Sequence, residues 1–285
     1  DGKTVCAGNE KLMKQIGCKY EDYSGYGTII HTAVNGEYAG YIVIADKIKE
    51  LILGSNNVVL VSGSEVMRET GLNGIRAEHM VYEIEDQYGY SGEEIITSPF
   101  FSRQVDTFYD YYKNVILNKT NVEPTAVYKA AAKLEKAGCI SHIVTRMIYG
   151  LYQKAGCKNV IELYGSAEEN RCPVCGKIFG SDYIKKAQGT PKCDKCNIVL
   201  RPGFSFFGEM IDNGRLTKAC NAVENADVLL VAGMALSSHT WASTLRYYEG
   251  DKLVLINNEE HLGDEKANYR MYGNLSEIFT YLADL

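Results

Sequence analysis

The 285-residue sequence lacks several features that would place a protein in a specialised class. No apolar run approaches the roughly 20 residues that a membrane helix needs, so we expect no membrane partner. Basic residues are not in excess: the net charge is −6, which argues against a nucleic-acid partner. Proline is scarce, with 5 residues, and 46% of the chain is hydrophobic, which is globular and not disordered composition. The first residues lack the basic and then apolar pattern of a secretion signal, so we predict a cytoplasmic protein.

Cysteine occurs 9 times, an odd number that does not suit a disulfide framework. Four of the nine form two Cys-x-x-Cys pairs, Cys172 with Cys175 and Cys193 with Cys196, with seventeen residues between the pairs. Each pair can direct two thiolates at one tetrahedral ion. Four protein ligands leave no open position on the ion, so we predict a structural Zn²⁺ site formed by these four residues. The alternative is a set of redox dithiols or free thiols.

Short apolar runs separated by helical segments determine the expected fold class. The runs are β-branched and do not alternate with polar residues, as in parallel strands that are covered on both faces. They lie at 57–63, 140–146, 226–233 and 252–257, and helices are predicted at 125–136 and 214–226. This order predicts an α/β fold with a doubly wound, Rossmann-like parallel sheet. Residues 28–45 differ, because Asn35-Gly36 between two β-rich runs predicts a hairpin. We therefore expect residues 1–45 to form an N-terminal β-hairpin appendage and residues 46–285 to form the main domain.

The order of motifs over about residues 46–285 resembles the sirtuin family of NAD-dependent protein deacylases. The similar stretches are PTAVYKAAAKLEKAGCISHIVTRMIYGLYQKAGCKNVIELYGS at 124–166, LRPGFSFFGE at 200–209 and AGMALS at 232–237. The resemblance implies a large Rossmann-type domain with a small inserted zinc-ribbon domain at about 167–203. It also implies NAD or ADP-ribose as the cofactor, with these cofactor-binding positions: Gly63, Gly71, Arg76, Gly233 and Asn257.

The sequence departs from the family pattern at the positions that the resemblance assigns to chemistry. Tyr164, in the predicted strand-and-turn VIELYGS at 160–166, stands where the family has its catalytic histidine. Glu65 replaces a glycine of the phosphate loop, where it would bring bulk and negative charge near a pyrophosphate. In that loop Gly74 and Ile75 replace an aspartate and a phenylalanine. Other residues replace polar side chains of the nicotinamide pocket: Arg146, Met147, Tyr149 and Tyr152.

A general base works best with a pKa near the operating pH, and tyrosine, with an ordinary pKa near 10, is a poor substitute for histidine. None of the five histidines falls on a family catalytic position, and His142 is expected to pack in the core. These replacements predict a pseudoenzyme that acts as a binding or regulatory protein. The alternative is an NAD-consuming enzyme with other catalytic groups, either an ADP-ribosyltransferase or a residual protein-lysine deacylase.

A protein or peptide partner is predicted for the groove between the two domains, near Phe204, Phe206 and Phe207, where a strand could be held by edge pairing. Packing of these rings in the core is the alternative. Residues 2–50 resemble the last part of the nucleotide-binding domain of heavy-metal P-type ATPases, with Gly8-Asn9 matching a pair at their ATP site. The phosphorylated DKTGT sequence of those pumps is missing. We therefore expect the appendage to pack on the main domain or to mediate association, with independent ATP binding as the alternative.

Overall fold

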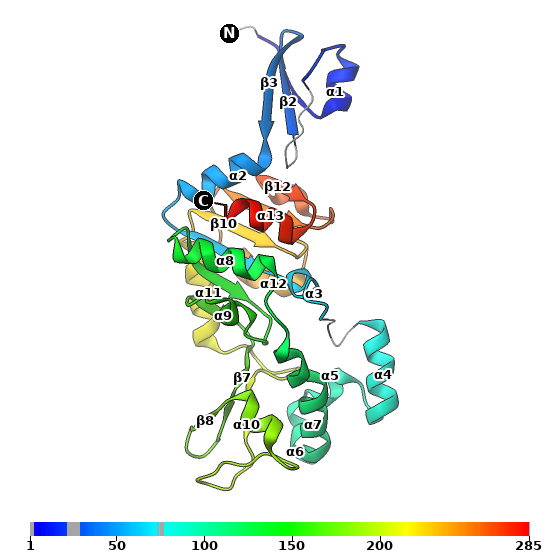
Figure 1. The fold of residues 1–285 in the computed structure, drawn as a ribbon, viewed down its shortest axis with the longest axis vertical. Coiled ribbons are helices and arrows are strands. Elements are labelled where there is room, and N and C mark those ends of the chain that lie inside the picture. The colour runs from blue at the N-terminus through cyan, green and yellow to red at the C-terminus, as the bar shows by residue number, and fades with distance from the viewer. Residues whose placement is uncertain (1–2, 22–28, 73, 75–76, 285) are drawn as a thin grey trace.

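The centre of the molecule is a six-stranded parallel sheet with the strand order β12-β11-β10-β4-β5-β6 (Figure 1). The computed structural model describes residues 3–21, 29–72, 74 and 77–284. The strands are β4 (Val58–Ser62), β5 (Ile140–Thr145), β6 (Val160–Glu162), β10 (Val228–Ala232), β11 (Leu253–Asn257) and β12 (Tyr269–Tyr272). The four predicted apolar runs are confirmed as β4, β5, β10 and β11. Neighbouring strands pair in parallel throughout this sheet.

Helices cover both faces of this sheet, which confirms the doubly wound α/β fold. Alternate residues of β4 enter two separate hydrophobic clusters, with Val58 and Leu60 in one and Val59 and Val61 in the other. Period-two alternation sends successive side chains to opposite faces, so a strand covered on both sides has to be apolar throughout. The covering helices are α2 (Ile44–Leu53), α8 (Ala126–Lys136) and α13 (Leu275–Leu282) on one face, and α11 (Asn213–Glu224) and α12 (His239–Leu245) on the other.

One core prediction is wrong, because His142 is exposed. It lies near the amino-terminal end of β5, where the pairing with β4 shifts register between Val58 and Val59. Its Nδ1 lies 3.2 Å from Ser141 Oγ. In the described ranges no helix combines the length and apolar character that crossing a bilayer requires.

A second lobe lies below the sheet in Figure 1 and contains the cysteine pairs. Its three-stranded antiparallel sheet has the order β8-β7-β9. The strands are β7 (Gly165–Arg171), β8 (Ile178–Phe179) and β9 (Arg201–Phe204), with α10 (Ser181–Lys186) beside them. A helical layer packs against them: α4 (Glu78–Tyr88), α5 (Gly92–Ile95), α6 (Ser98–Arg103), α7 (Val105–Tyr111), η1 (Tyr112–Ile116) and η2 (Leu117–Asn121). The short α9 (Leu151–Ala155) belongs to the first lobe and follows β5.

The N-terminal residues form a separate antiparallel sheet, which projects at the top of Figure 1. The predicted hairpin is confirmed as β2 (Ile29–Val34) and β3 (Glu37–Val43), turning at Asn35 and Gly36, which both have positive φ, 53° and 85°. The strand β1 (Val5–Gly8) and the helix α1 (Glu10–Gln15) complete this unit, which has a small hydrophobic cluster of its own. Because α2 begins at Ile44, directly after β3, the boundary at residue 45 stays a prediction.

Candidate functional site

The four cysteines of the two pairs come together in the second lobe. Their Sγ atoms all lie within 4.8 Å of one another, and those of Cys175 and Cys193 are 3.7 Å apart. Tetrahedral zinc with Zn–S bonds of about 2.3 Å requires S–S edges of about 3.8 Å, so the arrangement fits this ion. In the part of the chain that the structure describes, no other cluster of histidine, cysteine or carboxylate side chains has the geometry of a metal site.

The two cysteine pairs have the same local backbone, which explains why they converge. In the first, Gly176 N donates to Cys172 O and Cys172 N donates to Lys177 O, both at 2.9 Å. In the second, Asn197 N donates to Cys193 O and Cys193 N to Ile198 O, at 2.9 and 2.8 Å. The residue after each pair has positive φ, 71° at Gly176 and 54° at Asn197, a region open to glycine and tolerated by asparagine.

Two glycine turns meet at the carboxyl ends of β4 and β10, the place where open α/β sheets bind their ligands. Gly63 directly follows β4, and a Cβ there would lie 2.3 Å from Gly233 O. Gly233 has φ +67°, and its Cβ would lie 2.8 Å from Val66 N. Neither position accepts a side chain. Asn257 locks the same turn, because its Oδ1 accepts from Met234 N at 2.9 Å and its Nδ2 donates to Met234 O at 3.0 Å.

Glu65, in the first turn of α3 (Ser64–Arg68), lies in the predicted phosphate loop. Its Oε1 is 3.5 Å from Nε2 of His261, which follows β11, while its Oε2 is buried without a hydrogen-bond partner. Its backbone N–H donates to Gly233 O at 3.1 Å and is used within the protein. At this position of the turn the backbone amide is therefore used within the protein, and the side chain is a carboxylate.

Of the two other predicted cofactor positions, the structure describes Gly71 but not Arg76. Gly71 has φ +79°, and a Cβ at this position would meet open space. Glycine is therefore favoured here by the backbone conformation and not by a close neighbour. Arg76 and Ile75 lie outside the described residues. The cofactor roles of Gly63, Gly71, Gly233 and Asn257 stay predictions that follow from the resemblance.

Tyr164 lies in the turn between β6 and β7, at the junction of the two lobes. Arg146 directly follows β5, and because β5 and β6 pair in parallel, the two residues meet at the same edge of the sheet. The Arg146 guanidinium carbon lies 4.5 Å from the centre of the Tyr164 ring and 5.5 Å from that of Trp241 in α12. The cation thus lies against two aromatic rings at the predicted catalytic position.

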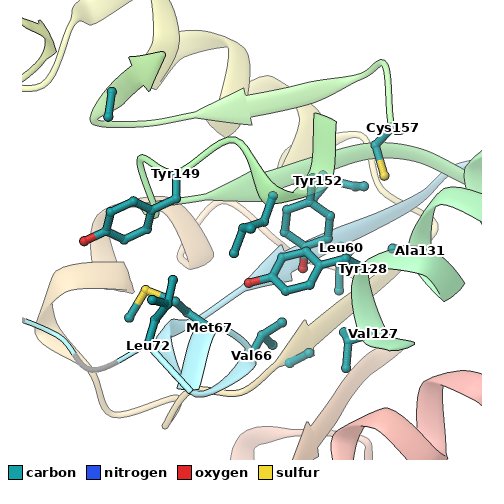
Figure 2. Packing of buried hydrophobic residues seen from close by; sticks show 14 of the residues in the cluster. Leu60, Val66, Met67, Leu72, Val127, Tyr128, Ala131, Tyr149, Tyr152 and Cys157 are labelled. Carbon is teal, nitrogen blue, oxygen red and sulfur yellow. The ribbon is translucent and has the colours of Figure 1, made fainter. Parts of the chain in front are cut away.

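The two other tyrosines of the predicted pocket point into the protein. Tyr149 is 6% exposed and Tyr152 is 3% exposed. Figure 2 shows both among apolar side chains, with the Tyr152 ring beside Tyr128 at a centroid distance of 4.6 Å. Burial raises the pKa of Tyr149 to about 12 and raises the pKa of Tyr152 well above its usual value. Neither phenol can accept a proton near neutral pH.

The phenylalanines of the predicted peptide groove divide into two sets. Phe204 and Phe206 are 6% and 2% exposed and pack on the aromatic rings of α7 and η1, so they belong to the core. Phe207 is 38% exposed. Nearby, Glu209 accepts from Arg201 at 2.6 and 2.8 Å and from Phe206 N at 2.8 Å, which fixes the start of the loop. A partner in this groove stays a prediction.

Sequence reasoning missed two contacts of this region. His261 was not identified as a partner of Glu65, and Trp241 was not associated with Arg146. The residues of each pair are far apart in the chain, and neither belongs to a short motif. The sirtuin resemblance pointed to Glu65, Arg146 and Tyr164 one by one, but not to their neighbours in the fold.

Comparison with known proteins agrees with this geometry. The model of the Sir2 family matches residues 63–240. A protein of Clostridium tetani named NAD-dependent protein deacetylase is 36% identical, over 81% of this chain and 94% of its own. The NAD-dependent protein deacylase 1 of Archaeoglobus fulgidus is 30% identical, over 83% and 96%.

Solved structures agree as well. A Sir2 homologue in complex with NAD superimposes with a TM-score of 0.72 at 29% identity, covering 84% of this chain and 92% of that one. A structure on sirtuin substrate affinity superimposes with a TM-score of 0.73 at 27% identity, covering 83% and 96%. With its two-lobed α/β fold, its four-cysteine cluster and this extent of similarity, the chain belongs to the Sir2 family.

Proposed function

We propose that this chain is a Sir2-family pseudoenzyme, a protein that keeps the fold and the structural metal of the NAD-dependent deacylases and acts by binding. The observation that carries the proposal is the position of Tyr164. Its ring lies against Arg146 where the resemblance assigns the family's histidine base. A phenol is mostly protonated at neutral pH and contributes little as a general base.

The buried tyrosines, the Glu65 carboxylate and the Glu65 amide also argue against an NAD-dependent reaction. Tyr149 and Tyr152 are buried phenols in place of polar pocket residues. Glu65 brings a carboxylate to the turn that would face the phosphates, and its contact with His261 crosses the carboxyl ends of the central strands. Like charge and a used backbone amide both oppose pyrophosphate binding there. Glu65 also stabilises α3, because an acidic side chain in the first turn interacts favourably with the positive end of the helix dipole.

An NAD-consuming enzyme with other catalytic groups is the second candidate. Arg146 favours it, because a cation held against the Tyr164 ring would attract the negative charge of a phenolate. The relatives favour it too, since they are named deacetylases and deacylases. In this candidate Tyr164 is the base for deacylation or for ADP-ribosyl transfer.

Nicotinamide release separates the candidates. The zinc-loaded protein is incubated with NAD alone and with NAD plus an acetyl-lysine peptide, and the Clostridium tetani relative serves as the positive control. We expect no release above the protein-free background. Turnover by the wild type that is lost in Tyr164→Phe would overturn the proposal, because this variant keeps the ring beneath Arg146 and removes only the hydroxyl. Heat on titration with ADP-ribose but no turnover would identify a nucleotide-binding pseudoenzyme.

A further inference from the structure

A cavity of about 630 Å³ lies at the junction of the two lobes, next to the Tyr164 turn, whose flanking residues Glu162 and Ser166 line it. Residues from η2, α9, β6, β7 and α10 line it. This volume is within the range of small-molecule sites, but the walls differ from the usual apolar lining. They carry six charged side chains, two basic and four acidic: Lys154, Lys185, Glu162, Glu168, Glu169 and Asp182.

The two lysines converge on one corner of the cavity, at the end of η2. Lys185 Nζ donates to Thr120 Oγ1 at 2.9 Å and to Asn121 Oδ1 at 2.8 Å, and Lys154 Nζ donates to Thr120 O. Glu168 Oε1 lies 3.9 Å from Lys154 Nζ, and this carboxylate also accepts from Ser181 Oγ. Within the described ranges Lys185 makes no ion pair, so this corner has an excess of positive charge.

Of the four carboxylates that line the cavity, two make an ion pair and two do not. Glu168 pairs with Lys154, and Glu169 pairs with Arg171 at 3.2 Å. Glu162 and Asp182 make no ion pair with any residue that the structure describes. Asp182 is exposed, whereas Glu162 is partly buried at the end of β6. In the part of the chain that the structure describes, one lysine and one partly buried carboxylate without an ion pair therefore face the same cavity.

The groups around Glu162 explain its charge state. Its pKa is raised from 4.5 to about 7, mainly by burial, and the nearby charge of Glu169 on β7 acts in the same direction. Hydrogen bonds from the Gln153 side chain and the Gly150 backbone, and the charge of Arg215 on α11, lower it again. Lys154, on α9, lines the cavity as well. A ligand cation beside Glu162 would favour the ionised carboxyl, and its affinity would depend on pH around neutrality.

We propose that this cavity binds a free α-amino acid, with the carboxylate of the ligand at Lys185 and Lys154 and its ammonium at Glu162. Such a ligand pairs with Lys185 and with Glu162 at once, which an anion or a cation alone does not. It would also bridge the two lobes, since Lys185 is on α10 and Glu162 is on β6 of the central sheet. The proposal does not depend on whether the Sir2-type site is active.

The test measures the thermal unfolding midpoint with each of the twenty common amino acids at 10 mM, followed by calorimetric titration of any that bind. Butyrate and n-butylamine, which carry one charge each, are the comparators. We expect at least one amino acid to bind and neither comparator to do so. Lys185→Ala and Glu162→Gln should each weaken binding at least 10-fold. Lys186→Ala, the exposed neighbour on α10, should leave it unchanged.

The pH dependence gives a second readout. With a pKa of about 7, the ionised fraction of Glu162 rises about 10-fold between pH 6 and pH 8, and the affinity should rise with it. In Glu162→Gln the affinity should not depend on pH in this range. The proposal is wrong if no amino acid binds, which would mean a water-filled gap between lobes. Equal binding of a comparator, or equal weakening by Lys185→Ala and Lys186→Ala, would refute it as well.

Discussion

Replacing Glu162 with glutamine should change how the stability of this protein depends on pH. Burial raises the pKa of Glu162 from 4.5 to about 7 in the folded state. A carboxyl whose folded pKa is raised contributes most to stability below its unfolded pKa, and this contribution is lost as the pH rises through the folded pKa. At about 1.36 kcal/mol per pH unit, the complete loss is at most about 3.4 kcal/mol.

The change in the free energy of unfolding is best measured between pH 5.5 and pH 8.5. Over this range the linkage relation predicts that Glu162 alone reduces the free energy of unfolding by about 2 kcal/mol. Glutamine has nearly the same shape and does not titrate, so the variant should lack this loss. The free energy of unfolding of the variant minus that of the wild type should therefore increase by about 2 kcal/mol from pH 5.5 to pH 8.5.

Urea denaturation followed by circular dichroism measures this difference, with zinc present throughout. Subtracting the wild type removes the pH dependence that the cysteine ligands cause in both proteins. Glu259→Gln, at an exposed position after β11, is the matched control and should follow the wild type. A constant difference between Glu162→Gln and wild type across the window would refute the reasoning, because it would mean that Glu162 is as ionisable in the folded chain as in the unfolded one.

Four other perturbations test separate parts of the molecule. Glu65→Gly should strengthen ADP-ribose binding at least 10-fold in calorimetry, and no gain would show that the carboxylate does not obstruct the phosphates. Metal analysis should find one zinc per chain and none in Cys193→Ser, which should also lose stability; a metal-free but fully stable wild type would contradict the site. Tyr112→Phe should cost about 1–3 kcal/mol in urea unfolding, because buried Asn170 Oδ1 then loses its 3.0 Å hydrogen bond. Residues 46–285 alone should stay soluble and bind zinc, whereas an insoluble product would place the N-terminal sheet within the folding unit.

The parts of the fold that the sequence predicted are those that depend on neighbours in the chain. A strand buried on both faces has to be apolar throughout, so 58–62 and 228–232 were recognisable from a few residues. The Asn35-Gly36 hairpin was predicted because both residues tolerate positive φ. His142 was misplaced because a shift in strand register, which no local pattern records, lies next to it.

The candidate site was only partly predictable for the same reason. The position of Tyr164 in a turn after a strand followed from the pattern VIELYGS, whereas the strand β7 that comes next was not predicted. Its contact with Arg146 requires β5 and β6 to be neighbours, and the contact with Trp241 requires the turn after β10 to reach the same edge. The meeting of Glu65 with His261 depends in the same way on the packing of two turns.

By itself, the amino-acid sequence determined the alternation of strands and helices, the two Cys-x-x-Cys pairs and the tyrosine at position 164. Each of these depends on residue type and spacing over short distances, where hydrophobic periodicity and turn chemistry act. The tertiary structure alone decided which charges are paired. It left Glu162 partly buried without an ion pair to any described residue, and it placed Lys185 at the same cavity, because β6 and α10 belong to different lobes that meet only in the folded chain.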